Sequence, residues 1–228
     1  MRSVIATAGL LLAALVSAPA SAQQWVEGKH YYLVQPAQRP NVEAGKIEVA
    51  EAFSYGCPAC YSFNPLAKQL QGQLPKNAQF IYQHASFNPS ESWPLFQRAY
   101  LTAVALGVDK KAHDAMFEAI WKTGELGVAD LKTNRLKNPQ PNMEQVAKFY
   151  ERTTGVKAAD FLNASKSMSV ELAIKRTEAW LRATRVDSTP TIVVNGKYRL
   201  TVQSAGGVDQ MFALVKFLIE KESTAAAG

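Results

Sequence analysis

The chain has 228 residues, of which 47% are hydrophobic and 19% charged, values typical of a globular protein and not of a disordered one. This length suits one domain, or one domain that carries a large insertion. The formal charge of +6 comes without a block of basic residues, which argues against a nucleic-acid-binding arm. Two cysteines and three histidines exclude a disulfide-rich scaffold and a structural zinc site built from cysteines alone.

The first 22 residues read as a secretory signal peptide. Arg2 supplies a short positive region, Val4 to Val16 is mostly apolar, and Ala20-Ser21-Ala22 forms a small-x-small cleavage pattern. The alternative is a membrane anchor, which needs roughly 20 strongly apolar residues, whereas polar residues, glycine and proline dilute this run. We therefore expect cleavage after Ala22, export of a soluble chain, and a compartment in which disulfides are allowed.

The following segment predicts a strand–helix–strand unit. Tyr31 to Val34 suits a short strand and Ile47 to Phe53 a longer one, although the longer one contains two acidic residues. A helix is expected from Pro58 through Leu70, with a kink at Pro65. Gln79 to His84 alternates well enough for the next strand.

The middle of the chain is helical in pattern and the end returns to strands. Helices are expected over these ranges: Trp93 to Leu106, Lys111 to Thr123, Met143 to Arg152, Phe161 to Ser167 and Val170 to Arg185. Thr191 to Val194, Asn195-Gly196 and Tyr198 to Thr201 predict a β-hairpin. Val208 to Ile219 predicts a last helix after a Gly206-Gly207 turn, followed by a frayed tail over Ser223 to Gly228. The order predicts an α/β fold in which the two ends share one sheet around an inserted helical part.

The two cysteines, Cys57 and Cys60, form a Cys-x-x-Cys pair. A structural disulfide between them would close a very short loop and contribute about 1.9 kcal/mol, against about 4.7 kcal/mol for a 100-residue loop. A metal site would need a second pair of ligands. The spacing therefore favours redox chemistry, with a structural disulfide as the main alternative.

The position of the pair assigns different roles to its members. Cys57 lies where a strand enters a helix, and unpaired N–H groups there stabilise a thiolate, so Cys57 is the expected attacking sulfur. Pro58 suits the first helical turn. Cys60 follows one turn later and is expected to be more buried, as a resolving thiol. Pro190 precedes a strand and is either a cis proline or an ordinary edge proline.

These segments together resemble the DsbA family of the thioredoxin superfamily. The likeness rests on Phe53-Ser54-Tyr55-Gly56-Cys57-Pro58-Ala59-Cys60, on Ala105-Leu106-Gly107-Val108, and on Thr189-Pro190-Thr191 through Asn195-Gly196-Lys197-Tyr198. It implies a thioredoxin-like fold over residues 23–85 and 186–228 with an inserted helical domain over residues 86–185. It also implies a periplasmic oxidoreductase that introduces disulfides into newly translocated proteins.

The resemblance further implies roles for individual residues. Thr189 and Pro190 would form a cis-proline loop facing the cysteines, where the Thr189 backbone pairs with an extended substrate. Glu51 would be a buried acid beneath the active site that moves a proton to or from Cys60. The redox-active disulfide would need no other cofactor and no metal. A membrane quinone-linked partner of the DsbB type would reoxidise the enzyme.

One residue departs from the family pattern. DsbA proteins commonly have Cys-Pro-His-Cys, and here Ala59 occupies the histidine position. A histidine beside the thiolate stabilises the reduced form, so we expect a higher Cys57 pKa and a less oxidising couple in this chain.

The remaining predictions concern aromatic and histidine side chains, the alternative functions and the oligomeric state. Tyr55 is the best-placed aromatic residue to line a peptide groove, whereas His84 and His113 read as surface or hydrogen-bonded polar residues and Trp93 as a packing residue. A reductase or isomerase and a non-redox peptide-binding chaperone remain alternative functions. Too few residues separate the predicted cleavage site from Ile47 for an N-terminal dimerisation domain, which favours a monomer.

Overall fold

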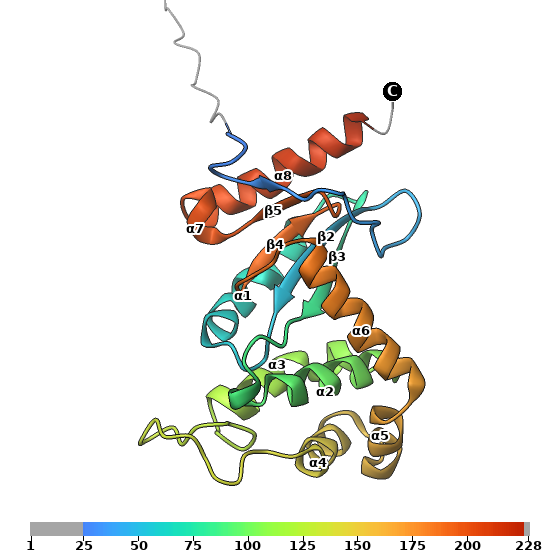
Figure 1. The fold of residues 1–228 in the computed structure, drawn as a ribbon, viewed down its shortest axis with the longest axis vertical. Helices are drawn as coiled ribbons and strands as arrows, with labels where there is room; N and C mark the ends of the chain where they lie inside the picture. Colours follow the sequence, from blue (N-terminus) through green and yellow to red (C-terminus); the bar gives the residue numbers. More distant parts are fainter. Residues whose placement is uncertain (1–24, 226–228) are drawn as a thin grey trace, which may run out of the picture.

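The computed structural model describes residues 25–225, so the predicted signal peptide and the cleavage after Ala22 lie outside the described residues (Figure 1). The elements in chain order are β1 (Tyr32–Leu33), β2 (Ile47–Phe53), α1 (Pro58–Gln73), β3 (Ala78–His84), η1 (Pro89–Glu91), α2 (Trp93–Ala105), α3 (Asp109–Trp121), α4 (Met143–Thr154), α5 (Ala158–Ser165), α6 (Met168–Ala183), β4 (Thr191–Val194), β5 (Tyr198–Leu200), α7 (Val202–Ala205) and α8 (Val208–Ala225). The predicted thioredoxin-like α/β architecture with a helical insertion is confirmed.

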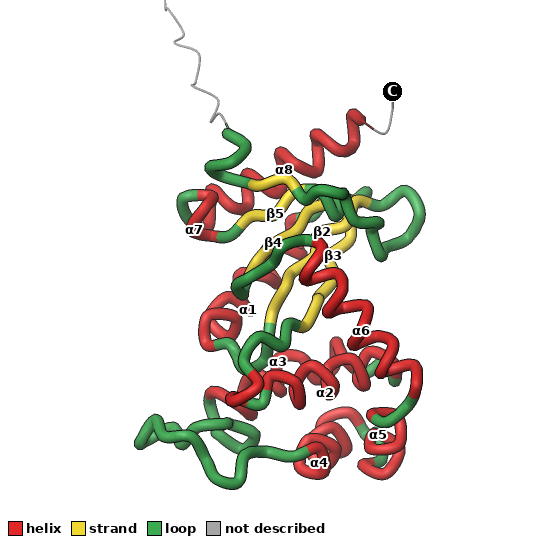
Figure 2. Tube along the Cα trace, viewed as in Figure 1, coloured by secondary structure: helices red, strands yellow, loops and turns green. Residues whose placement is uncertain are grey.

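The five strands form one mixed sheet in the order β1-β5-β4-β2-β3 (Figure 2). β2 pairs in parallel with β3 and antiparallel with β4, so it lies inside the sheet and all seven of its residues are buried. Strands buried on both faces are normally apolar throughout. The two acidic residues of β2, Glu48 and Glu51, are therefore the exceptions that need an explanation.

The two faces of the sheet belong to different parts of the core. Ile47 and Val49 of β2 pack in one cluster with residues of α1 and α8. Ala50 and Ala52 point to the opposite face, where they join a cluster that includes residues of α2 to α6. Because successive side chains of a strand alternate, Glu51 shares the face of Ile47 and Val49 and is directed toward α1.

The segment between β3 and β4 is helical, as predicted. In Figure 1, α2 to α5 gather below one end of the sheet, and α6 runs back up beside it. The observed boundaries differ by a few residues because end-capping fixes them. Ser167 caps the start of α6 with its side chain, and Gly155 ends α4 in the left-handed conformation at φ 88°. The domain boundaries at residues 86 and 185 stay a prediction.

The C-terminal part corrects one expectation. The tail predicted to fray from Ser223 is helical through Ala225, because Glu222 is buried and holds α8 to the β4–β5 hairpin. Its carboxylate accepts hydrogen bonds from Asn195, Lys197 and Tyr198 at 2.6 to 2.8 Å. The predicted hairpin turn is confirmed, with φ of 51° at Asn195 and 63° at Gly196.

Candidate active site at the start of helix α1

Cys57 lies at the turn between β2 and α1, where its side chain caps the helix. The Cys60 N–H donates to Cys57 Sγ at 3.3 Å, and Pro58 occupies the first helical turn as predicted. Cys57 is 5% exposed and Cys60 is fully buried, whereas Pro58 and Ala59 are exposed. Both cysteines are free thiols, so the structure represents the reduced form of the pair.

The two thiols differ sharply in acidity. The hydrogen bond with the Cys60 thiol, helped by Thr189 and by the N–H groups of Cys60 and Ala59, lowers the pKa of Cys57 to about 6 against the opposing effect of burial. Burial and the neighbouring Cys57 sulfur raise the pKa of Cys60 well above its usual range. At neutral pH the pair therefore consists of a Cys57 thiolate and a Cys60 thiol, which is the division of roles that the sequence predicts.

The loop that precedes β4 faces this sulfur from a distant part of the sequence. The Thr189–Pro190 peptide bond is cis, as the resemblance implies. When protonated, Cys57 Sγ donates to the Thr189 carbonyl at 3.5 Å. Thr189 and Pro190 are both partly exposed, so their backbone is accessible beside Cys57. The structure thus brings together the two motifs that the sequence separates by more than a hundred residues.

Glu51 lies behind the pair, in the interior. It is 2% exposed, and its Oε2 atom has no hydrogen-bond partner. Burial, with a further contribution from the charge of Cys57, raises the pKa of Glu51 to about 8. The Glu51 charge in turn raises the pKa of Cys60. A buried acid that is still protonated at neutral pH can donate a proton, which the same side chain in water could not do.

Tyr55 does not lie where the sequence analysis places it. Its side chain is fully buried, with the hydroxyl 3.0 Å from His113 Nδ1, so it does not line a peptide groove in this conformation. Its backbone N–H donates to His84 Nε2 at 3.1 Å, and its carbonyl accepts from Trp121 Nε1 at 2.8 Å. Tyr55 therefore anchors the turn before Cys57, and the two histidines are buried polar residues with hydrogen bonds.

A close contact on the other side of this turn, between Gly56 and Trp93, is not predictable from the sequence. A Cβ atom at Gly56 would lie 2.6 Å from Trp93 Nε1, so only glycine fits between the indole ring and the turn. Phe87, which is 41% exposed, packs against the Trp93 ring with centroids 6.2 Å apart. In the sequence, the only feature that indicates this contact is a glycine, Gly56, directly before Cys57.

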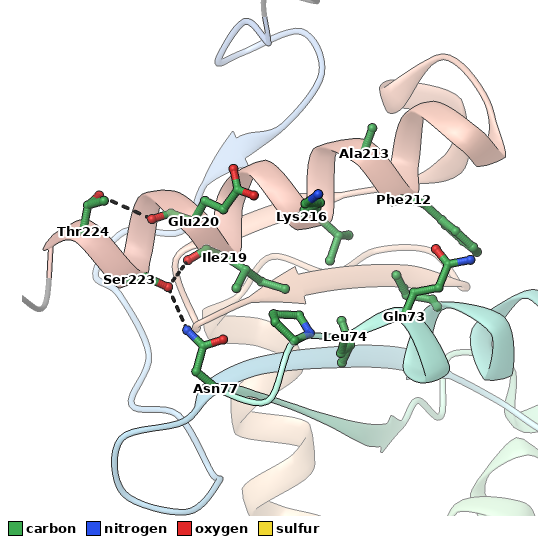
Figure 3. A pocket seen from close by; sticks show the side chains of 13 residues that line it. Gln73, Leu74, Asn77, Phe212, Ala213, Lys216, Ile219, Glu220, Ser223 and Thr224 are labelled. Atoms are coloured by element: carbon green, nitrogen blue, oxygen red, sulfur yellow. Dashed lines mark hydrogen bonds between the residues drawn. The ribbon is translucent and has the colours of Figure 1, made fainter.

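The described part of the chain offers few other chemical sites. Residues 25–225 contain no cluster of His, Cys, Asp and Glu suited to a metal ion, and no helix among them is long and apolar enough to cross a membrane. An apolar pocket of about 580 Å³ lies between the end of α1 and α8, where Leu74, Phe212 and Ile219 contribute side chains (Figure 3). Because Cys57 is at the opposite end of α1, this pocket is separate from the redox pair.

Comparisons with known proteins show which family the chain resembles. A thioredoxin family model matches residues 42–214. The thiol:disulfide interchange protein DsbA of Pseudomonas aeruginosa is 36% identical over 227 residues, covering 99% of both chains, and that of Pseudomonas syringae is 34% identical, covering 99% of this chain and 98% of the relative.

Solved structures show the same relationship. The crystal structure of Pseudomonas aeruginosa DsbA has a TM-score of 0.75 at 33% identity, covering 90% of this chain and 97% of that one. The Xylella fastidiosa DsbA structure also has a TM-score of 0.75, at 31% identity, covering 87% and 98%. The chain therefore belongs to the DsbA family of the thioredoxin superfamily and is a disulfide-forming thiol:disulfide oxidoreductase, whose redox pair fits Cys57 and Cys60.

Proposed function

We propose that the protein passes a Cys57–Cys60 disulfide to newly translocated proteins in the periplasm. The observation that carries this proposal is the contrast between the two thiols, an acidic Cys57 and a buried Cys60 of high pKa. A thiolate that is stable at neutral pH is a good leaving group, and it favours the reduced form of the enzyme. Both effects drive transfer of the disulfide toward the substrate.

The reaction has two exchange steps. A substrate thiolate attacks Cys57 Sγ of the oxidised pair, which forms a mixed disulfide and releases the Cys60 sulfur as a thiolate. A second substrate thiolate then attacks the substrate sulfur of the mixed disulfide and releases the Cys57 thiolate. Two electrons move from the substrate to the cysteines. Of the two protons that the substrate thiols lose, one is balanced by protonation of Cys60 and the other stays in the solvent.

Glu51 is the group proposed to protonate Cys60. The Cys60 thiolate released in the first step is buried and strongly basic, so it needs a proton donor inside the protein. The Glu51 carboxyl, with its pKa of about 8, holds a proton at neutral pH, and once that proton has left, the negative charge of the carboxylate raises the pKa of Cys60. General acid catalysis of this kind contributes roughly a hundredfold or more to a rate.

The substrate contact is proposed at the cis-proline loop. The accessible Thr189 backbone beside Cys57 suits pairing with an extended polypeptide, with Pro190 fixing the shape of the loop. The partners are reduced or unfolded exported proteins, followed by a membrane quinone reductase of the DsbB type that restores the disulfide. The protein works as a monomer after cleavage behind Ala22, with the cysteine pair as its redox centre.

The experiment that tests this function compares wild type with Cys57→Ser on a reduced, unfolded protein that needs disulfides for activity. The oxidised wild type should restore native disulfides, and the variant should restore none. Light scattering in the same assay separates the alternative functions. Retained suppression of aggregation with equal refolding yields for both proteins would identify a non-redox chaperone and contradict the proposal. Activity that appears only with scrambled disulfides would identify an isomerase.

A further inference from the structure

The segment between α3 and α4, residues 122–142, carries a small hairpin. Ala129 and Leu136 form an antiparallel bridge, and the Asp130 N–H donates to the Arg135 carbonyl at 2.9 Å. The Asp130 carboxylate accepts hydrogen bonds from two further backbone N–H groups of the turn, at 2.8 and 3.0 Å. The backbone of the hairpin thus bonds largely within itself, so the hairpin meets its surroundings mainly with side chains.

Both ends of this segment are fixed beside the redox pair. At its start, Trp121 Nε1 donates to the carbonyl of Tyr55, two residues before Cys57. At its end, Gln140 Nε2 donates to the Ser90 carbonyl of η1 at 2.7 Å. In Figure 1 the chain between α3 and α4 extends outward beyond these helices. The hairpin therefore projects from a base that adjoins the turn carrying Cys57.

The side chains at the tip of the hairpin are apolar and basic. Leu131 and Leu136 are 51% and 54% exposed, more than any other leucine of residues 25–225. Lys132 and Arg135, which lie between them in the sequence, are exposed as well. Neither cation forms a salt bridge within the part of the chain that the structure describes. The tip thus combines unpaired positive charge with apolar side chains held in water.

The acidic residues of the segment do not cancel this charge. Residues 122–142 carry a net charge of +2, four basic residues less two acidic ones. Glu125 forms a salt bridge with Arg152 of α4, and the Asp130 carboxylate bonds to N–H groups of its own turn. Both acids are therefore engaged within the protein, and the tip presents a positive surface.

A projecting tip of this composition suits a flat anionic surface better than a polypeptide. Peptides are generally bound in grooves or along free strand edges, whereas the backbone groups of this hairpin bond to one another. A bilayer that contains anionic phospholipids attracts lysine and arginine side chains, and its interface takes up apolar ones. Two leucines and two cations give weak, reversible binding and not a stable anchor.

We propose that the hairpin of residues 128–137 docks the protein reversibly on the surface of an anionic phospholipid membrane. Leu131 and Leu136 enter the headgroup region, and Lys132 and Arg135 bind lipid phosphates. Because the base of the hairpin adjoins the turn before Cys57, docking holds the redox pair near the membrane surface, where a membrane-bound redox partner is reached by diffusion in two dimensions. The inference goes beyond the proposed function and does not depend on the direction in which the cysteines pass electrons.

The test is co-sedimentation of the purified exported protein with vesicles of phosphatidylglycerol and phosphatidylcholine in equal parts, and with vesicles of phosphatidylcholine alone. The wild type should bind the anionic vesicles, leave them at high salt, and bind phosphatidylcholine far more weakly. One basic residue near an anionic bilayer raises partitioning by roughly fivefold, so Lys132→Glu with Arg135→Glu should lower it by about thirtyfold or more. Leu131→Ser with Leu136→Ser should lower it by about tenfold.

Matched control variants change the same kinds of side chain on α6, which lies on the other side of the helical part in Figure 1. Lys175→Glu with Arg176→Glu replaces two exposed cations and alters the net charge by the same amount. Met168→Ser with Leu172→Ser removes two exposed apolar side chains. Both controls should lose far less vesicle binding than the corresponding variants of the tip.

Several outcomes would overturn the proposal. They are wild-type vesicle binding by both tip variants, an equal loss in the α6 variants, and a wild type that binds both kinds of vesicle equally or binds neither. Without vesicles, the tip variants should react with a reduced unfolded protein at the wild-type rate, which shows that their fold and redox chemistry are intact. A slower rate there, together with unchanged vesicle binding, would identify the tip as a polypeptide contact and contradict the proposal.

Discussion

Ala59 lies between the two cysteines, and its replacement by histidine tests how the Cys57 thiolate is stabilised. In the structure this stabilisation comes from the Cys60 thiol, from Thr189 and from N–H groups at the start of α1, and the exposed methyl group of Ala59 adds no donor. A histidine at this position adds a hydrogen-bond donor or a positive charge close to the sulfur. The thiolate, and with it the reduced form of the protein, should become more stable.

The size of the effect follows from the pKa of Cys57. With a pKa of about 6, Cys57 is already mostly ionised at pH 7, so a further decrease stabilises the reduced form almost in full. A nearby donor or charge shifts a pKa by about one unit or more, and one unit corresponds to about 1.4 kcal/mol. For this two-electron couple, that energy raises the redox potential by about 30 mV.

The assay is equilibration of wild type and Ala59→His with glutathione buffers at pH 7, read by intrinsic fluorescence. Thiolate absorbance as a function of pH gives the Cys57 pKa of the same two proteins. We expect a potential at least about 30 mV less negative together with a lower pKa. An unchanged or more negative potential would refute the reasoning that the residue between the cysteines sets the oxidising power.

Three further variants test separate parts of the structure. Cys60→Ser should accumulate a mixed disulfide through Cys57 with disulfide-containing proteins, seen on non-reducing gels, because no resolving thiol remains. Glu51→Gln should stabilise the reduced protein to urea at pH 7 by up to about 3 kcal/mol, since burial raises the pKa of Glu51 from 4.5 to about 8 and folding must keep it protonated while the unfolded chain ionises. Glu222→Ala should lower stability by about 2 to 3 kcal/mol without loss of redox activity, because three donors lose a buried acceptor.

Each of these variants has an outcome that contradicts the structural argument. Mixed disulfides that form equally in Cys57→Ser, which keeps only the Cys60 thiol, would not pass through Cys57. The gain from Glu51→Gln should vanish near pH 4, where both the folded and the unfolded chain are protonated. A gain of the same size at both pH values would show that the charge is not its cause. Wild-type stability of Glu222→Ala would mean that α8 does not depend on this anchor.

The chemistry of the redox pair was predictable because its causes are local in sequence. A strand, a short turn and a helix that begins at Pro58 place Cys57 at the N–H groups of the first turn, whatever surrounds them. The hairpin at Asn195-Gly196 was predictable for the same reason. The family resemblance added what local patterns could not, namely that Glu51 is buried and that the Thr189–Pro190 peptide bond is cis.

The remaining features depend on contacts between segments that are distant in sequence. Tyr55 reads as a candidate for a surface groove, yet the packing of α3 against the sheet places its hydroxyl on His113. Asn64 reads as an ordinary polar helix residue, and only the structure shows that its side-chain amide donates a hydrogen bond to Asp114 of α3. No periodicity or propensity encodes such environments, because the partner residues belong to other elements.

The most direct test of the account is the state of Cys57 and Cys60 in growing cells, measured by rapid acid quenching and alkylation with a thiol reagent that changes the protein's mobility. An enzyme that donates disulfides and is reoxidised by a membrane partner should be found mostly with the Cys57–Cys60 bond formed. A protein found mostly with both thiols free would contradict the assignment as an oxidase and would indicate a reductase or an isomerase.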